Sequence, residues 1–249
     1  MSFEIQIAPL SHFELVRLID TSTKTVIEIA TKGALLNSWQ VMGHSKSMEI
    51  VEGNDFSKGW GDFEAGGFKG GKMSPFSCRI QNGQYTFEDK TYTIEKFYHE
   101  KHALHGILYD ALFSVELSET DDQGAYLHLK YHYEATDKGF PFAYTVLIKW
   151  HLLKNNVVTA ETIITNLTDS TIPMMDGWHP YFKLGKTIND CTLQFINKGI
   201  SGQTTPQILK RFGSDISIEK VKSVIILAGI NDIAQNTGPI TITEIANNV

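Results

Sequence analysis

The chain has 249 residues, 42% of them hydrophobic and 20% charged, an ordinary balance for one large all-β domain or two smaller domains. The net charge of -6 gives no basic surface for nucleic acid, and two cysteines are too few for a disulfide framework. The N-terminal sequence MSFEIQIAPLSHFELVRLID has the pattern of neither a signal peptide nor a membrane span. We therefore expect a cytoplasmic protein with no membrane segment and no nucleic-acid partner.

The first 190 residues are rich in strand patterns. Segments with β-branched and aromatic residues, or with alternating apolar and polar residues, occur at 25–30, 91–97, 127–134, 142–153 and 157–167. A turn at 33–36 leads into a further strand at Ser38 and Trp39, and Lys154-Asn155-Asn156 predicts a hairpin between the last two segments. Long helical periodicity is absent, so we predict a mainly β fold, a large antiparallel β-sandwich.

Residues 53–72 (GNDFSKGWGDFEAGGFKGGK) are rich in glycine and aromatic residues. Two interpretations are open. A long surface loop is favoured on general grounds, and a loop that lines a ligand cleft is the alternative. A phosphate-binding loop is excluded, because no Gly-Lys-Ser/Thr follows.

The sequence changes character near its end. All nine histidines, four tryptophans and nine tyrosines precede residue 183. Residues 204–218 have helical spacing with Pro206 in the first turn, and residues 221–227 (VKSVIIL) are typical of a buried strand in a parallel sheet. We predict a domain boundary, with a β-sandwich at 1–192 and a short α/β segment at 193–249.

Three motifs occur in a fixed order. The sequence SCRIQNGQYTF at 77–87 contains Arg79, ALHG at 103–106 contains His105, and GWHPYFKL at 177–184 contains His179. Together they resemble motifs of the aldose 1-epimerase (galactose mutarotase-like) family, over roughly residues 3–192. The resemblance implies a galactose mutarotase-like β-sandwich, in agreement with the strand patterns.

The resemblance also implies an enzyme that interconverts the anomers of an aldose by opening the sugar ring. This reaction delivers a proton to the ring oxygen and removes one from the anomeric hydroxyl. By match to the motifs, His179 is the general acid, His105 helps to polarise the ring oxygen, and Arg79 holds a sugar hydroxyl. Asp176 and Trp178 flank the third motif and are expected near the sugar. No cofactor is implied.

The same residues have simpler interpretations when each is taken alone. Arg79 would be an ion-paired surface residue and His105 a turn histidine. His99, His102 and His105 are spaced by three, but in a strand or loop this spacing does not place three imidazoles on one face, so we expect no metal site. Both cysteines, Cys78 and Cys191, are expected to be small buried residues.

The chain also departs from the family. Cys78 stands where asparagine is common, Ile107 where a second glycine is common, and Trp178 and Lys183 also differ. The family's general base is a glutamate near the C-terminus, and the context of Glu244 (TITEIANNV) does not match its segment. The sequence therefore predicts a truncated sandwich in which the base is missing.

The tail has a second resemblance. Residues 195–249 are similar to the middle of a GDSL/SGNH-type hydrolase, in which Gly202 and Asn231 would match an oxyanion hole. No Gly-Asp-Ser nucleophile segment occurs, and no histidine follows residue 179.

Three functions follow from these patterns. An aldose 1-epimerase-type isomerase is favoured. The alternative is an inactive sugar-binding relative, or a chimeric fragment joined near residue 195. An esterase fragment is least supported, because the nucleophile and its histidine are missing. Each of the first two has an aldose as its partner, and the oligomeric state is left open.

Overall fold

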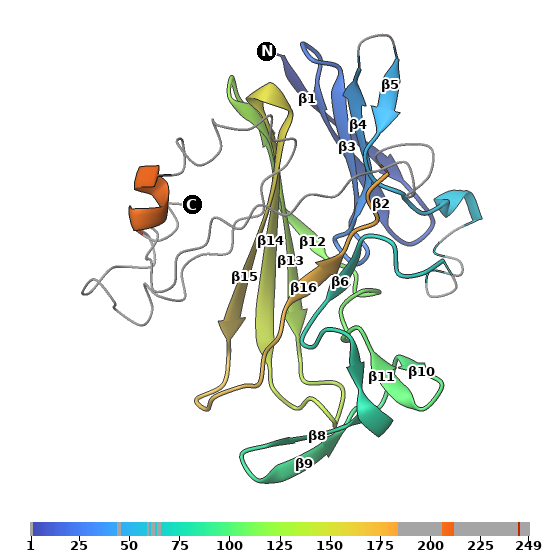
Figure 1. Cartoon of the computed structure of the whole chain (residues 1–249), viewed down its shortest axis with the longest axis vertical. Coiled ribbons are helices and arrows are strands. Elements are labelled where there is room, and N and C mark those ends of the chain that lie inside the picture. Colours follow the sequence, from blue (N-terminus) through green and yellow to red (C-terminus); the bar gives the residue numbers. More distant parts are fainter. Residues whose placement is uncertain are drawn as a thin grey trace. The chain divides into compact units, whose positions relative to one another are not determined.

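The computed structural model describes residues 2–43, 46–58, 60, 63, 66–183, 206–211 and 244. By its internal packing the chain divides into two units, Met1–Cys191 and Thr192–Val249. The strands described below all belong to the first unit (Figure 1). The predicted boundary after residue 192 lies outside the described residues and stays a prediction.

The described part of the first unit is built from short and medium strands. They are β1 (Phe3–Pro9), β2 (Glu14–Asp20), β3 (Thr25–Ala30), β4 (Leu36–Met42), β5 (Ser47–Glu49), β6 (Gly71–Met73), β7 (Arg79–Ile80), β8 (Gln84–Phe87), β9 (Lys90–Thr93), β10 (Tyr98–His99), β11 (His102–Leu104), β12 (Ser114–Thr120), β13 (Gly124–Tyr133), β14 (Tyr144–Leu153), β15 (Val157–Asn166) and β16 (Gly177–His179). Three 3-10 turns, η1 (Phe56–Lys58), η2 (Gln81–Gly83) and η3 (Lys154–Asn156), connect some of them.

Two antiparallel sheets form the body of this unit. One has the strand order β1-β2-β3-β4-β5, and the other has the order β12-β13-β14-β15 (Figure 1). Strands β1 and β2 lie against β12, β13 and β14, so the two sheets enclose a common core. Leu18 and Ile27 from the first sheet and Leu127 and Ile148 from the second are fully buried in it. The predicted mainly β, antiparallel fold is confirmed.

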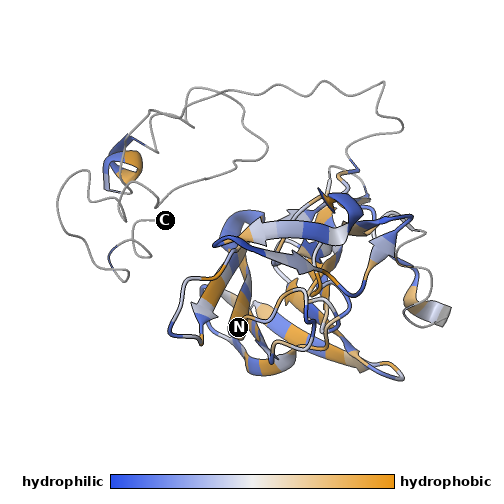
Figure 2. Cartoon of the chain, turned by 90° about the horizontal axis from the view of Figure 1, so that it is seen from below, coloured by the Kyte–Doolittle hydropathy of each residue, from blue (hydrophilic) through white to orange (hydrophobic). Residues whose placement is uncertain are grey.

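The alternation of side chains explains why these segments form sheets. In β14 every second residue, from Tyr144 to Leu152, is buried, and the residues between them are partly exposed. Figure 2 shows this alternation as hydrophobic and hydrophilic bands along the strands. The predicted hairpin of β14 and β15 is present, and its turn has Asn155 and Asn156 in the left-handed conformation, with φ of 65° and 62°.

The strand predicted at 91–97 ends earlier than expected. Strand β9 stops at Thr93, and Ile94 enters the core. The backbone N–H of Glu95 donates to the carboxylate of Asp137 instead of to a partner strand. A side-chain acceptor from a distant loop therefore ends this strand.

The glycine-rich segment at 53–72 is packed through its aromatic residues. Phe56, Phe63 and Phe68 are buried in a second hydrophobic cluster together with Phe13 and Tyr109. The favoured interpretation, a surface loop, is wrong for these side chains, because residues distant in the sequence cover them. The segment ends in β6, which places it next to the site described below.

The tail contributes little to this description. Residues 206–211 are helical, inside the helix predicted at 204–218. The strand predicted at 221–227, Cys191, Gly202 and Asn231 all lie outside the described residues. Of the helices that the structure describes, none has the length and hydrophobicity needed to cross a bilayer.

Candidate functional site

Backbone hydrogen bonds fix His179 from both sides. Strand β16 pairs antiparallel with β6, with His179 opposite Gly71. The N–H of Gly70 donates to the carbonyl of His179 at 3.0 Å, and the N–H of Glu52 donates to the carbonyl of Tyr181 at 2.7 Å. Pro180 lacks an N–H, which ends the strand directly after His179. The imidazole is thus carried by a backbone that is held at several points.

A turn after β11 brings His105 to the same place. His105 and Gly106 both have left-handed backbones, with φ of 60° and 84°. The N–H of His105 donates to the carbonyl of Cys78 at 2.9 Å, and Gly106 makes an isolated parallel bridge to Ser74. The ring of His105 then meets that of His179 edge-on, with centroids 5.1 Å apart and planes at 75°.

The environment of His105 favours its neutral form. Burial lowers the pKa of His105 below its ordinary value of 6.5, and the neighbouring His179 and Arg79 lower it further. Its Nδ1 atom is buried and has no hydrogen-bond partner among the described residues. Buried polar atoms are normally paired, so this unpaired nitrogen is an exception that also disfavours a charged imidazole.

Histidine burial predicts how the stability of the folded protein depends on pH. Burial also lowers the pKa of His128 and His151, as it does for His105. The unfolded chain therefore binds protons at these sites more readily than the folded protein. The free energy of unfolding should be highest above the ordinary histidine pKa of 6.5 and decrease as the pH falls below it.

Thermal unfolding measured from about pH 8 to about pH 5 checks this dependence. Carboxyl groups with a lowered pKa, such as Asp20, change the stability only at lower pH, so they do not contribute in this range. The double variant His128→Gln/His151→Gln should show a shallower decrease of the melting temperature than the parent. A melting temperature that rises as the pH falls through this range would contradict the prediction.

Arg79 lies near His105, on the strand that pairs with β11. In β7 it pairs with Leu104 of β11, the residue directly before His105. Its side chain is exposed, and its charge acts on the imidazole of His105. The structure therefore brings Arg79, His105 and His179 together, as the three motifs predict. Their individual roles stay predictions.

Trp178 of β16 and Asp176, directly before this strand, lie on the face opposite to that of His179. They contact Lys72, a residue that the sequence did not indicate. The ammonium of Lys72 lies 2.5 Å from Oδ2 of Asp176, 3.0 Å from Oγ1 of Thr162 and 4.3 Å from the ring centroid of Trp178. Burial lowers the pKa of Lys72, and Asp176 opposes this shift. Asp176 and Trp178 thus have protein partners, and their contact with a sugar stays a prediction.

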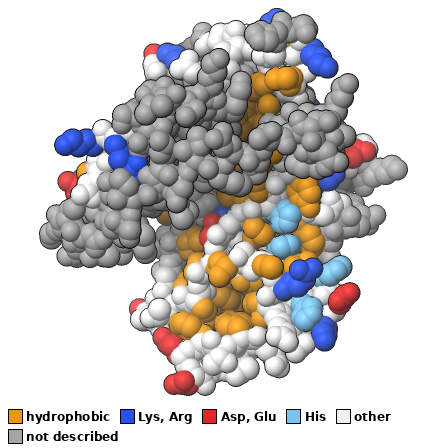
Figure 3. Space-filling view, in the orientation of Figure 1, with side chains coloured by type: hydrophobic (Ala, Val, Ile, Leu, Met, Phe, Trp, Pro, Cys, Tyr) orange, Lys and Arg blue, Asp and Glu red, His pale blue; other side chains and the backbone are white. Residues whose placement is uncertain are grey.

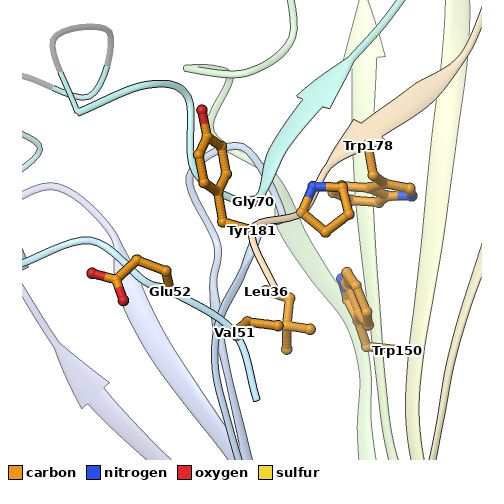
Figure 4. Close-up of a pocket in the computed structure, with 8 residues that line it drawn as sticks. Leu36, Val51, Glu52, Gly70, Trp150, Trp178 and Tyr181 are labelled. Carbon is orange, nitrogen blue, oxygen red and sulfur yellow. The ribbon is translucent and has the colours of Figure 1, made fainter. Parts of the chain in front are cut away.

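A small apolar hollow lies beside Trp178. Figure 4 shows Leu36, Val51 and the rings of Trp150 and Trp178 around it, with the carboxylate of Glu52 directed away. Its volume is about 50 Å³, far below the roughly 300 Å³ of the smallest typical ligand sites. This hollow is too small to hold a sugar.

Several histidine side chains gather on one face of the molecule, next to hydrophobic side chains and a basic one (Figure 3). His102 is engaged locally, because its Nδ1 accepts from the N–H of Asn82 at 3.2 Å. Among the described residues, no three His, Cys, Asp or Glu side chains are placed to hold a metal ion.

Cys78 is exposed, so its predicted burial is wrong. Its left-handed φ of 58° lies in the turn that receives the N–H of His105.

Comparison with known proteins agrees with the fold. The sequence model of the family described as aldose 1-epimerase matches residues 14–207. The chain belongs to the aldose 1-epimerase family. The match ends beyond residue 192, the predicted end of the epimerase-like part. No comparison supports the hydrolase resemblance of the tail, and a search of curated proteins gives no significant match.

Solved structures of mutarotase-like proteins share the fold. A galactose 1-epimerase from Lactobacillus acidophilus NCFM is 16% identical, with a TM-score of 0.58 over 74% of this chain and 54% of that one. A galactose mutarotase-like protein from Clostridium acetobutylicum is 18% identical, with a TM-score of 0.61 over 73% and 54%. A GalM/aldose epimerase homologue from C. elegans is 18% identical, with a TM-score of 0.55 over 73% and 51%. This aldose 1-epimerase family member therefore spans about half the length of these structures.

Proposed function

We propose that this aldose 1-epimerase family member binds an aldose at Arg79, His105 and His179 and accelerates the interconversion of its anomers. The observation that carries the proposal is the edge-on pair of His105 and His179, whose ring centroids lie 5.1 Å apart. Two imidazoles of this kind offer both a hydrogen-bonding group and a proton donor near neutral pH.

The proposed reaction gives each group a separate task. His179 in its protonated form delivers a proton to the ring oxygen while the bond between that oxygen and C1 breaks. The anomeric hydroxyl loses its proton and becomes the carbonyl of the open chain. His105, kept neutral by burial, hydrogen-bonds the sugar, and the guanidinium of Arg79 holds a hydroxyl group. Closure of the ring on the other face of the carbonyl reverses these steps and gives the other anomer.

The anomeric proton needs an acceptor. None of Arg79, His105 and His179 is assigned this task, so water takes this proton in the proposed reaction. One positioned acid or base typically increases the reaction rate by a factor of about 10²–10⁴. We therefore expect acceleration that is smaller by about this factor than in a site with both groups.

A second candidate is a protein that binds aldoses without turnover, because no side chain of the site is assigned as the acceptor of the anomeric proton. Polarimetry on freshly dissolved α-D-galactose and α-D-glucose separates the two. Faster decay of the optical rotation with protein than with buffer supports the isomerase. Binding of either sugar in calorimetry without faster decay supports the second candidate. Neither binding nor acceleration with these or other common aldoses would overturn both.

A further inference from the structure

Lys72 is the charged side chain with the lowest exposure among the described residues, at 0%. An ammonium group loses its hydration when it is buried, and this cost must be offset by partners. Lys72 has three of them, the carboxylate of Asp176, the hydroxyl of Thr162 and the ring face of Trp178. No sugar can reach an ammonium that is shielded so completely, so a direct contact with substrate is excluded.

The position of Lys72 in the strand register links it to His179. Lys72 lies opposite Trp178 in the ribbon of β6 and β16, and the next pair is Gly71 with His179. Side chains alternate along a strand, so Asp176 and Trp178 face Lys72 while His179 faces the other side, where it meets His105. A change at Lys72 thus acts on the backbone that carries His179.

The ribbon of β6 and β16 is too short to fix itself. Each strand has three residues, and an isolated two-stranded ribbon is marginally stable even when longer. Lys72 ties the ribbon to β15 through Thr162, and Trp178 packs against Trp150 of β14 at 5.3 Å between centroids. The buried ammonium is therefore a polar link between the ribbon and the β12–β15 sheet.

We propose that Lys72 is a positioning residue, whose buried ion pair with Asp176 holds β16 so that the imidazole of His179 meets that of His105. Asp176 and Trp178, which the motif places at the sugar, act in this proposal through Lys72. The catalytic part of the proposal rests on the proposed function, whereas the geometric part does not.

The test compares Lys72→Met with Lys149→Met. Methionine keeps the length of the side chain and removes the ammonium. The control removes a more exposed ion pair, Lys149 with Glu161 at 2.8 Å, between β14 and β15. NMR of the imidazole resonances of His105 and His179 over a pH titration reports their geometry and pKa. Polarimetry of α-D-galactose gives kcat and KM.

In Lys72→Met we expect shifted imidazole resonances for both histidines. We also expect a fall in kcat of about tenfold or more with KM changed by less than about threefold. Lys149→Met should leave both measurements as in the parent. A folded Lys72→Met protein with unchanged imidazole resonances would overturn the proposal. If the parent shows no anomerase activity, the proposed function fails and the imidazole resonances still decide the role of Lys72.

Milder variants cover the case in which Lys72→Met does not fold. Asp176→Asn keeps an oxygen acceptor for the ammonium, and Thr162→Val removes the hydroxyl only. Each should shift the His179 resonance in the same direction and by less than loss of the whole ion pair. Unchanged resonances in both variants would overturn the proposal.

Discussion

Replacing His179 with asparagine is expected to lower kcat/KM for the anomerisation of an aldose by about 10²–10⁴, because the variant loses its general acid. Asparagine keeps a polar side chain of similar size and removes the titrating imidazole. Polarimetry of a freshly dissolved α anomer measures the rate directly. The pH dependence of kcat/KM should also flatten, since the proposed general acid is gone.

His132→Asn is the matched control. His132 lies on β13 with an exposed side chain, so its loss should leave the rate unchanged. A folded His179→Asn protein with the parent's rate would contradict the assignment of the acid. If the protein only binds sugar, neither protein accelerates anomerisation, and His179→Asn should then weaken the binding seen in calorimetry.

Three strands of the β12–β15 sheet, β13, β14 and β15, were predictable because their signal is local, whereas β12 was not predicted. Successive residues of β14 face the core and the outer side in turn, and this alternation can be recognised in ten consecutive residues of the sequence. The turn at Asn155 and Asn156 is equally local, since asparagine tolerates the left-handed conformation. The fold class follows from such segments without knowledge of distant contacts.

The burial of the glycine-rich segment was not predictable in this way. Phe63 and Phe68 pack against Tyr109, about 40 to 46 residues later in the sequence, in a cluster that also contains Phe13. No local pattern specifies that pairing. The same holds for Cys78, whose exposure depends on a turn that receives a hydrogen bond from His105.

The candidate site shows the same division. The ordered motifs identified Arg79, His105 and His179, and the structure brings them together through β7 with β11 and β6 with β16. Lys72 carried no signal, because a lysine after a run of glycines is typical of an exposed loop. Its importance comes from its pairing with Trp178 across β6 and β16 and from its ion pair with Asp176. Both partners lie about a hundred residues later in the sequence.

Gly106→Ala is expected to destabilise the folded protein by about 2–6 kcal/mol and to displace His105. Gly106 has a φ of +84°, which costs a residue with a side chain about 1–3 kcal/mol. A Cβ atom there would also lie 2.2 Å from the carbonyl oxygen and 2.5 Å from the nitrogen of Ser74, so the backbone must shift at a further cost of about 1–3 kcal/mol.

Urea denaturation of parent and variant gives the difference in unfolding free energy. Gly43→Ala is the control, because its Cβ would lie 3.1 Å from the carbonyl oxygen of Lys46, and we expect a change of about 1 kcal/mol or less. Parent-like stability of Gly106→Ala would mean that the turn after β11 differs from the one described. The edge-on contact of His105 with His179 depends on this turn, so the same measurement tests the geometry on which the proposed reaction stands.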